Sequence, residues 1–293
     1  MRAAPLAAKN LGAAYLELVK PRILSMVLIT TTLGFFLGGK GTIDIFLLFK
    51  LLIGVALVCG GSATLNHYLE RDADSRMERT RNRPIPQGII SPANALIFGI
   101  LLVLTGVFML WWEVNLLTAF LSLLTAFLYI LVYTPMKKIS WINTTIGAIP
   151  GALPPMGGWA AATGDLSAGA WVLFFILFTW QHPHFYSIAW MYKEDYQRGG
   201  FKMLPVVYPD GYLMFTQIKL FAFLLIPISL LPTLFGMSGP LYFWGALTAG
   251  VFFLVQGMIL ATTHTVSDAA KLLRASVIYL PVILFLIVID ASF

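Results

Sequence analysis

Nine long apolar stretches constrain this chain more than any other feature of its sequence. Each is about 20 residues long, the length that a helix needs to cross the hydrocarbon core of a bilayer. They cover residues 22–39, 46–69, 93–112, 115–134, 140–161, 169–192, 216–235, 240–262 and 273–290. A span in lipid must satisfy its backbone hydrogen bonds internally, which favours helices. The sequence therefore predicts an all-α fold, a polytopic membrane bundle of nine transmembrane helices, forming a single domain over residues 1–293.

The composition excludes the class of soluble globular domains. Hydrophobic residues make up 59% of the chain and charged residues 11%, whereas soluble domains are about 45–50% apolar and about 25% charged. Cys59 is the single cysteine, which excludes a disulfide framework and a cysteine-rich metal site. Residues 1–20 lack the continuous apolar core of a secretory signal, and we expect them to form an amphipathic segment at the membrane interface.

The basic residues predict the orientation of the bundle. When the nine spans are counted in order, only Lys40 and Lys50 of the 19 basic residues fall on the side opposite the N-terminus. Because basic loops stay inside, the N-terminus and a polar cap are expected in the cytoplasm. This sorting also accounts for the net charge of +6 without a nucleic-acid partner. The short segment before the first span favours a bacterial inner membrane over a mitochondrial one.

A charged segment, NHYLERDADSRMERTRNRP at residues 66–84, follows the second stretch. Asn66, Glu70 and Asp74 have the spacing i, i+4, i+8, which places them on one face of a helix. Stacked like charges repel, so a bound cation would stabilise such a face, and Mg²⁺ prefers oxygen ligands of this kind. Asp72 points to a different face. The arrangement predicts a magnesium site at the end of this helix.

Arginines follow these acidic residues. Forked guanidinium donors suit a diphosphate, so Arg79 and Arg83 are candidate phosphate contacts beside the metal. The alternative is a solvated loop whose arginines serve topology alone, which leaves the interleaved acids unexplained. Lys137, after Tyr133 at the end of the fourth stretch, and Arg22, beside the first, are either further phosphate contacts or topology charges.

A second polar cluster, WQHPHFYSIAWMYKEDYQRGGFKMLP at residues 180–205, lies at the end of the sixth stretch. It contains Tyr192, Asp195 and Lys202, and it falls on the same membrane side as the first cluster. The two clusters are therefore expected to converge on a shared pocket. His182 and His184 lie deeper, where ionisable groups usually face a cavity or a partner. Either could contact a large cofactor-like substrate or ligate its iron, or could simply bond a neighbouring carbonyl.

These motifs resemble those of a known family. NHYLERDAD resembles the first acidic motif, Asn-x-x-x-Asp-x-x-x-Asp, of the UbiA-type intramembrane prenyltransferases, and NRPIPQG resembles their downstream Arg-Pro segment. The resemblance runs through all nine stretches. HPHFYSIAWMYKEDYQRGGFKMLPVV narrows it to the members that farnesylate protoheme.

The resemblance implies a nine-helix bundle with a cytoplasmic polar cap and a lateral opening to lipid. It implies Mg²⁺ as cofactor, with farnesyl diphosphate and protoheme (heme B) as substrates in the bilayer. The products would be diphosphate and heme O, on the way to heme A for terminal oxidases. It also suggests contact with a heme A synthase that acts next.

The family's functional residues carry over by motif position. Asn66, Glu70 and Asp74 become the first metal site, and Asp195 becomes the second, with Tyr192 beside it. Glu70 replaces the more general aspartate, and Tyr192 stands where a further aspartate often lies, so the number of metal ions is open. The expected substrate contacts are Arg22, Arg79, Arg83, Tyr133, Lys137, Tyr192, Lys202, His182 and His184.

Two other functions fit part of the pattern. A related prenyltransferase could act on a quinone precursor or another aromatic acceptor, which the acidic motifs do not distinguish from protoheme. A transporter also places polar residues in broken helices. Its charges would gather near the midplane, whereas the charges here gather at one membrane surface.

Overall fold

The protein is helical throughout the part of the chain that its computed structural model describes, residues 10–292. No β-strand occurs in that range; a single bridge joins Ser238 and Ala291. The helices are α1 (Leu11–Leu18), α2 (Pro21–Gly38), α3 (Ile45–Asp74), α4 (Pro92–Glu113), α5 (Leu116–Phe127), the π-helix η1 (Leu128–Tyr133), α6 (Thr134–Ile139), α7 (Asn143–Thr163), α8 (Ala168–Met191), α9 (Lys193–Arg198), α10 (Leu204–Val207), α11 (Tyr212–Leu234), α12 (Pro240–Thr263) and α13 (Val266–Ile289).

Seven of the described helical segments are long and apolar enough to cross a bilayer, so the chain is an integral membrane protein. They are α2, α3, α4, the continuous segment α5–η1–α6, α11, α12 and α13. The remaining two expected spans, 140–161 and 169–192, correspond to α7 and α8, which also run through the bundle but are more polar. α7 contains three prolines, and α8 contains Gln181, His182 and His184. Seven of the nine expected spans are therefore confirmed by length and composition.

Several predicted boundaries differ from the structure, among them the expected span end at residue 134, which lies inside α5–η1–α6, and the expected span start at residue 216, since α11 begins at Tyr212. α3 continues to Asp74, beyond the expected end at residue 69, so the whole acidic face is helical. The predicted connection at 263–272 is wrong, because α13 already begins at Val266. The Thr265 hydroxyl accepts a hydrogen bond from the amide of Asp268 and caps the helix there. Asp268 and Lys271 thus lie on the first turns of α13.

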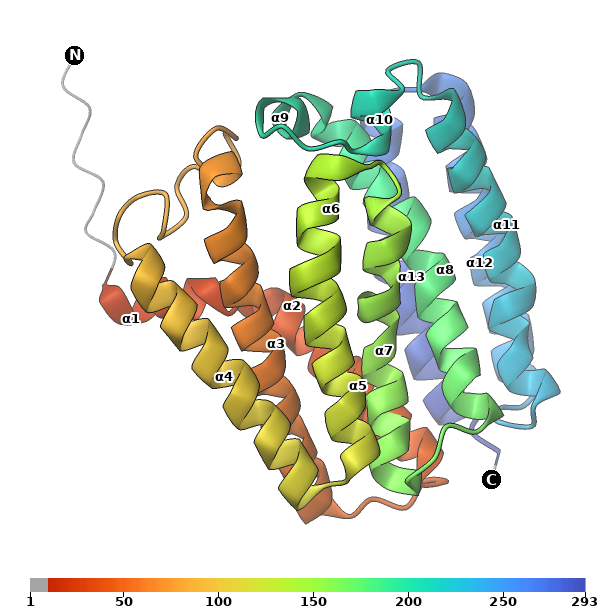
Figure 1. The fold of residues 1–293 in the computed structure, drawn as a ribbon. Helices are drawn as coiled ribbons and strands as arrows, with labels where there is room; N and C mark the ends of the chain where they lie inside the picture. The colour runs from red at the N-terminus through yellow and green to blue at the C-terminus, as the bar shows by residue number, and fades with distance from the viewer. Residues whose placement is uncertain (1–9, 293) are drawn as a thin grey trace.

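The helices are arranged so that the predicted polar segments meet (Figure 1). The C-terminal end of α3, α6, α9 and α10 all lie at one end of the bundle, and the C-terminus of the chain lies at the other. α1 lies across the long helices, and it packs Ala14 and Leu18 against Ile85 and Ile90 of the loop after α3. The expected interfacial segment 1–20 is thus helical over α1, while residues 1–9 lie outside the described part.

Small residues allow α2 and α7 to approach closely. A Cβ atom at Gly34 would collide with the carbonyl of Pro155, and one at Gly158 would collide with the carbonyl of Thr31. Interfaces of this kind are common between membrane helices, because small residues let two backbones pack directly. The contact fixes α2 against α7, and both helices line one large cavity.

Candidate active site

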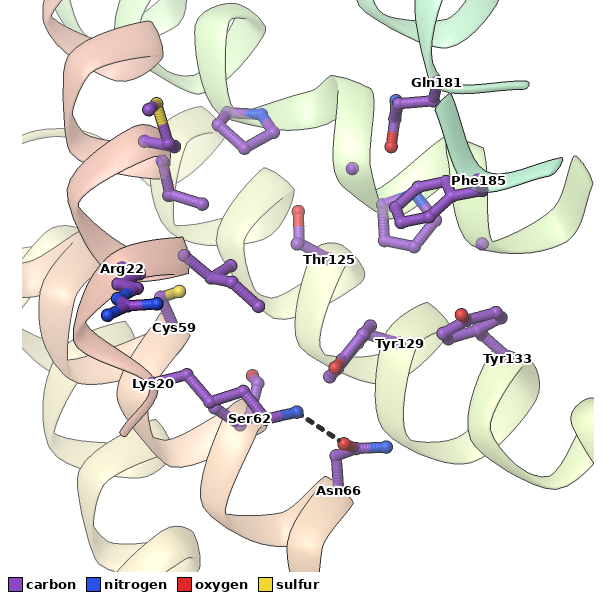
Figure 2. Close-up of a pocket in the computed structure, with 18 of the residues that line it drawn as sticks. Lys20, Arg22, Cys59, Ser62, Asn66, Thr125, Tyr129, Tyr133, Gln181 and Phe185 are labelled. Carbon is purple, nitrogen blue, oxygen red and sulfur yellow. Dashed lines mark hydrogen bonds between the residues drawn. The ribbon is translucent and has the colours of Figure 1, made fainter. Parts of the chain in front are cut away.

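A large cavity opens among α2, α3, η1, α7, α8 and α13, with a volume of about 1390 Å³. Pockets for one drug-sized ligand are roughly 300–1,000 Å³, so this cavity has room for more than one ligand. Glu70 and Asp74 line it from the end of α3 that lies near α9, and the apolar residues Val58, Leu153 and Leu177 line it from the middle turns of α3, α7 and α8. Figure 2 shows Lys20 and Asn66 on one side and the rings of Tyr129 and Tyr133 facing the same space.

Asn66, Glu70 and Asp74 line the cavity from a single face of α3, as their spacing predicted. Their exposed fractions are 1%, 5% and 0%. Asp72, between them in sequence, points outward with 74% of its side chain exposed. We call the three buried residues the acidic ladder.

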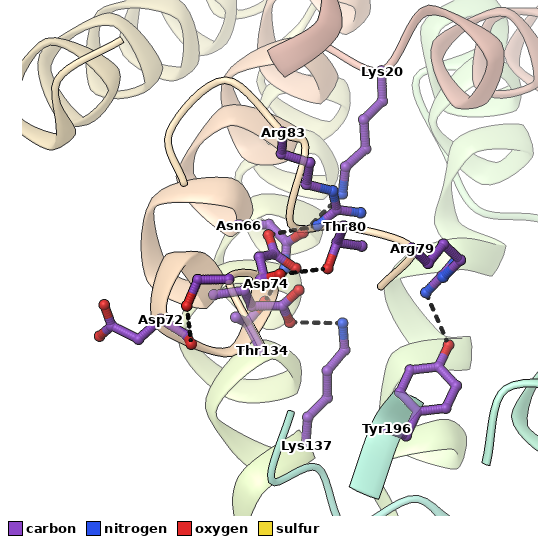
Figure 3. A network of polar contacts seen from close by, with 12 residues as sticks. Lys20, Asn66, Asp72, Asp74, Arg79, Thr80, Arg83, Thr134, Lys137 and Tyr196 are labelled. Atoms are coloured by element: carbon purple, nitrogen blue, oxygen red, sulfur yellow. Dashed lines mark hydrogen bonds and ion pairs between the residues drawn. The ribbon is translucent and has the colours of Figure 1, made fainter. Parts of the chain in front are cut away.

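Each member of the acidic ladder is paired with a cation from a different segment (Figure 3). The three donors come from the α1–α2 junction, from α6 and from the loop after α3. The donor–acceptor distances are 2.7 Å from Lys20 Nζ to Asn66 Oδ1, 2.7 Å from Lys137 Nζ to Glu70 Oε1, and 2.6 Å from Arg83 Nη1 to Asp74 Oδ2. Ladder and cations therefore form one polar network in which two carboxylates and one carboxamide each bind a basic side chain.

Two cavity-lining side chains, Asp74 and His67, have buried polar atoms that form no hydrogen bond in the described structure. Asp74 Oδ1 and both ring nitrogens of His67 are buried without a partner among the described residues. An orphaned buried polar atom costs free energy unless a ligand satisfies it. No cluster of three His, Cys, Asp or Glu side chains within residues 10–292 could enclose a metal ion alone. The ladder oxygens thus fit Mg²⁺ held jointly with substrate phosphate, which is its usual arrangement.

Lys20 and His67 are cavity residues that the sequence did not single out. Lys20 precedes α2 with a φ of 51°, in the left-handed region, and this turn directs its side chain to Asn66. Burial and the nearby positive charge of Arg83 together lower the pKa of Lys20 to about 7. The predicted neighbour, Arg22, is exposed at the cavity rim.

Asp195 of the second cluster lies outside the lining of the large cavity. Its Oδ1 accepts hydrogen bonds from the Glu78 amide at 2.9 Å and Arg198 Nη2 at 2.6 Å, and its Oδ2 accepts one from the Arg79 amide at 3.2 Å. Burial raises the pKa of this carboxyl, but the bonds from Arg198 and the two amides outweigh burial and lower it. The two clusters meet, because Asp195 holds the loop between α3 and α4, residues 75–91, which we call the arginine loop; Asp195 itself does not share the large cavity.

The arginine loop reaches the cavity through Arg79. Its guanidinium lies over the rings of Tyr192 and Tyr196, 5.0 and 5.7 Å from the centroids, and Nη2 lies 3.4 Å from the Tyr196 hydroxyl. Tyr196 lines the large cavity, whereas Tyr192 lines a smaller hollow beside Asp195. The side chain of Lys202 is exposed and does not line the large cavity; its amide donates to the Lys137 carbonyl.

The π-helix η1 carries Tyr129 and Tyr133, which line the same cavity as the acidic ladder. Such insertions are frequent at functional sites. The Thr134 hydroxyl donates to the Tyr129 carbonyl at 2.8 Å and accepts from Asn66 Nδ2 at 3.1 Å. Lys137 Nζ lies 4.5 Å from the centroid of the Tyr133 ring. The predicted pair Tyr133 and Lys137 therefore lies in the cavity together with Glu70.

The two histidines of α8 have different surroundings. His182 has Nδ1 2.8 Å from the Phe178 carbonyl and Nε2 3.3 Å from the Thr145 hydroxyl, and it does not line the cavity. His184 lines the cavity, and its Nδ1 lies 2.7 Å from Ser276 Oγ. The spacing i, i+2 places them on different sides of the helix, as expected.

Comparison with known proteins identifies the family of this chain. The model of the UbiA prenyltransferase family matches residues 27–282. The chain belongs to the UbiA prenyltransferase family. A relative from Solibacter usitatus named protoheme IX farnesyltransferase is 47% identical over 94% of this chain and 98% of its own length. The protein of the same name from Salinibacter ruber is 46% identical over 94% of this chain and 98% of its own.

Solved structures of UbiA proteins share the fold. A structure of digeranylgeranylglyceryl phosphate synthase has a TM-score of 0.81 at 18% identity and covers 96% of this chain and 98% of its own. A UbiA homologue from Archaeoglobus fulgidus, bound to GPP and Mg²⁺, has a TM-score of 0.64 at 16% identity, covering 94% and 99%. At this identity the likeness establishes the common helical architecture.

Proposed function

We propose that the chain is a Mg²⁺-dependent farnesyltransferase that joins farnesyl diphosphate to a vinyl group of protoheme and yields heme O and diphosphate. The observation that carries this proposal is the acidic ladder with its three paired cations at one end of an otherwise apolar cavity. The names of the relatives that align over nearly the whole chain support protoheme as the acceptor.

The cations of the network would bind the diphosphate. In the structure Lys20, Lys137 and Arg83 are held by the ladder, and each side chain is long enough to turn from a ladder oxygen to a phosphate oxygen. Asn66, Glu70 and Asp74 would then be free to hold Mg²⁺, which, when bound, supplies positive charge to the leaving diphosphate. Asp195 is the expected second metal contact; to serve in that role it would have to release the amides of Glu78 and Arg79.

The transfer requires bond cleavage at the allylic carbon. The C1–O bond of farnesyl diphosphate breaks, and its electron pair leaves with the diphosphate, where Lys137 and Arg83 stabilise the added charge. The π electrons of the vinyl group form the new C–C bond. A water molecule adds to the resulting cation and gives up a proton, which the diphosphate can accept. The product carries the hydroxyethylfarnesyl group of heme O.

The deeper cavity would protect the allylic cation. Its apolar lining keeps most water away from the reacting carbon. The rings of Tyr129 and Tyr133 line the same space, and aromatic faces stabilise cations. The farnesyl tail would lie along the apolar residues below them.

The substrates would enter from the membrane. Ile23 and Met26 of α2 and Val277 of α13 line the cavity although about half of each side chain is exposed, which suggests a lateral opening between these helices. We propose nine spans, with α7 and α8 completing the seven, an N-terminus and polar cap in the cytoplasm, and a bacterial inner membrane. Contact with a heme A synthase stays a prediction.

The decisive experiment combines purified protein in nanodiscs with protoheme, farnesyl diphosphate and Mg²⁺, followed by mass analysis of the heme. We expect the mass of heme O, dependent on Mg²⁺ and absent for Asp74→Ala. Prenylation of a quinone precursor instead of protoheme would favour the alternative acceptor. Solute flux in liposomes without release of diphosphate would favour a transporter and overturn the proposal.

A further inference from the structure

His184 is the histidine of α8 that faces the cavity, and its hydrogen bonds determine its tautomer. Ser276 Oγ donates its single proton to the Leu273 carbonyl at 2.6 Å. The same oxygen lies 2.7 Å from His184 Nδ1 and must therefore accept there, so Nδ1 carries the ring proton. His184 Nε2 then bears a lone pair, and within the described chain no hydrogen bond to it is recorded.

The His184 ring is held in place from a second side. The Trp180 ring is stacked on it, with a centroid distance of 4.8 Å and an interplanar angle of 26°. Trp180 Nε1 donates to the Ser276 carbonyl at 2.9 Å. One residue of α13, Ser276, thus binds both rings, through its hydroxyl and its carbonyl. The side chain is fixed before any ligand enters, which reduces the ordering cost of binding.

This arrangement has the features of a metal-ligating histidine. Such a residue presents a neutral ring nitrogen to the metal and donates its other N–H to an oxygen, which fixes the ring and raises its basicity. His182 lacks these features, because both of its nitrogens lie near oxygens and its ring is stacked on Phe221 at 3.6 Å. The two histidines therefore differ in their capacity to bind a metal.

His184 lies within α8, away from the C-terminal end of that helix. It precedes Met191, the last residue of α8, by seven residues (191 − 184), or about 10 Å at the helical rise per residue. A porphyrin carries its iron at the centre and its vinyl groups at the edge, so the iron must lie away from the reacting carbon. His184 lines the cavity, as do Phe185 of the same helix and Leu280 of α13.

We propose that His184 Nε2 binds the iron of the protoheme acceptor and so positions the vinyl edge of the porphyrin at the diphosphate end of the cavity. This inference rests on the proposed function and adds the residue that selects an iron porphyrin over an iron-free aromatic acceptor. Ser276 acts as a positioning residue that holds the Nδ1–H tautomer.

The test is a titration of the purified wild-type protein with ferric protoheme, read by the Soret band and by electron paramagnetic resonance. The wild type is expected to show a nitrogen-ligated iron. His184→Ala should lose this signature and bind protoheme at least about tenfold more weakly, and added imidazole should restore the signature by filling the vacated space. His182→Ala is the matched control and should keep the wild-type spectrum.

Ser276→Ala should keep the nitrogen signature with about tenfold weaker affinity, since it removes only the support of the ligand. Unchanged binding of farnesyl diphosphate by His184→Ala verifies that the variant is folded. The inference is overturned if His184→Ala keeps the signature, if His182→Ala loses it, or if the wild type makes heme O while its bound iron has no nitrogen ligand. If the wild type makes heme O without a nitrogen ligand on the iron, only the role of His184 is rejected and the proposed function is retained. A His184-dependent signature without product formation would support the ligand and reject the transfer.

Discussion

The two charged clusters of this protein look alike in sequence and have different surroundings in the structure. Residues 66–83 and 192–202 each combine acids with bases at the same end of the bundle. In the first, the acidic ladder lines the large cavity and is paired with the long cationic side chains of Arg83 and Lys137. In the second, Asp195 lies outside that lining and is bonded to main-chain amides and Arg198.

The difference separates a site whose partners are all side chains from one that is also bonded to main-chain amides. Lys137 and Arg83 can move from a carboxylate to a phosphate by rotating side-chain bonds. The amides of Glu78 and Arg79 can leave Asp195 only if the loop itself moves. The first cluster is therefore suited to bind a charged ligand, and the second is suited to fix the loop that carries Arg79 and Arg83. The following predictions test this division, starting with the largest effect.

Asp74→Asn should cause the largest loss. It removes a buried charge whose Oδ1 is unpartnered in the described structure and available to a metal. We expect kcat for diphosphate release to fall by about 10³-fold, the upper range for losing one group that stabilises transition-state charge. The matched control is Asp72→Asn, which alters an exposed carboxylate two residues away and should leave kcat unchanged. Equal losses of kcat in Asp74→Asn and Asp72→Asn would contradict the assignment of ligand binding to the cavity-lining face of α3.

The ladder could be predicted from sequence because its geometry belongs to one helix. Asn66, Glu70 and Asp74 share a face by helical periodicity alone, whatever surrounds them. Their partners could not be predicted, because Lys20 and Lys137 lie 46 and 67 residues from the atoms that they contact. The same holds for Ser276, which lies 92 residues from His184.

Some features of the fold also could not be predicted from the sequence. Apolar stretches predicted the long helices to within a few residues, since lipid requires helical backbone. The π-helix at Leu128–Tyr133 was not predicted, because its residues are as apolar as those of an ordinary span. The early start of α13 was missed because the apolar stretch begins only at residue 273, whereas Asp268 and Lys271 form an ion pair at 2.7 Å on the first turns of the helix.

Lys137→Met should cause the second largest loss. It leaves Glu70 buried without its cation, and breaking such a pair costs about 3–5 kcal/mol. We expect kcat/KM for farnesyl diphosphate to fall by about 10²-fold, as when one oxyanion donor is removed. Lys138→Met, on the exposed side of the same helix, is the control and should match the wild type. If both variants behaved alike, Lys137 would serve topology alone.

Asp195→Asn tests the second cluster. We expect a loss of about tenfold in kcat/KM, because a charged hydrogen-bond acceptor is worth about 1.5–3 kcal/mol and the loop would become more mobile. The Mg²⁺ concentration for half-maximal activity should stay at the wild-type value. Faster hydrogen exchange in residues 75–83 would report the released loop. A marked rise in the Mg²⁺ requirement would instead establish Asp195 as a metal ligand.

Tyr196→Phe and Tyr192→Phe should cause the smallest effects. They compare a tyrosine that lines the large cavity with one that only packs against Arg79. Tyr196 lines the cavity, and its hydroxyl lies 3.4 Å from Arg79 Nη2, a long bond whose loss should cost about 0.5–1 kcal/mol, or a few-fold in KM. Tyr192 keeps its aromatic face under Arg79 when the hydroxyl is removed, so Tyr192→Phe should match the wild type. Initial rates at limiting farnesyl diphosphate measure both. If Tyr192→Phe proved the more damaging, the Tyr192 hydroxyl would contact substrate, and the boundary of the binding site would extend into the second cluster.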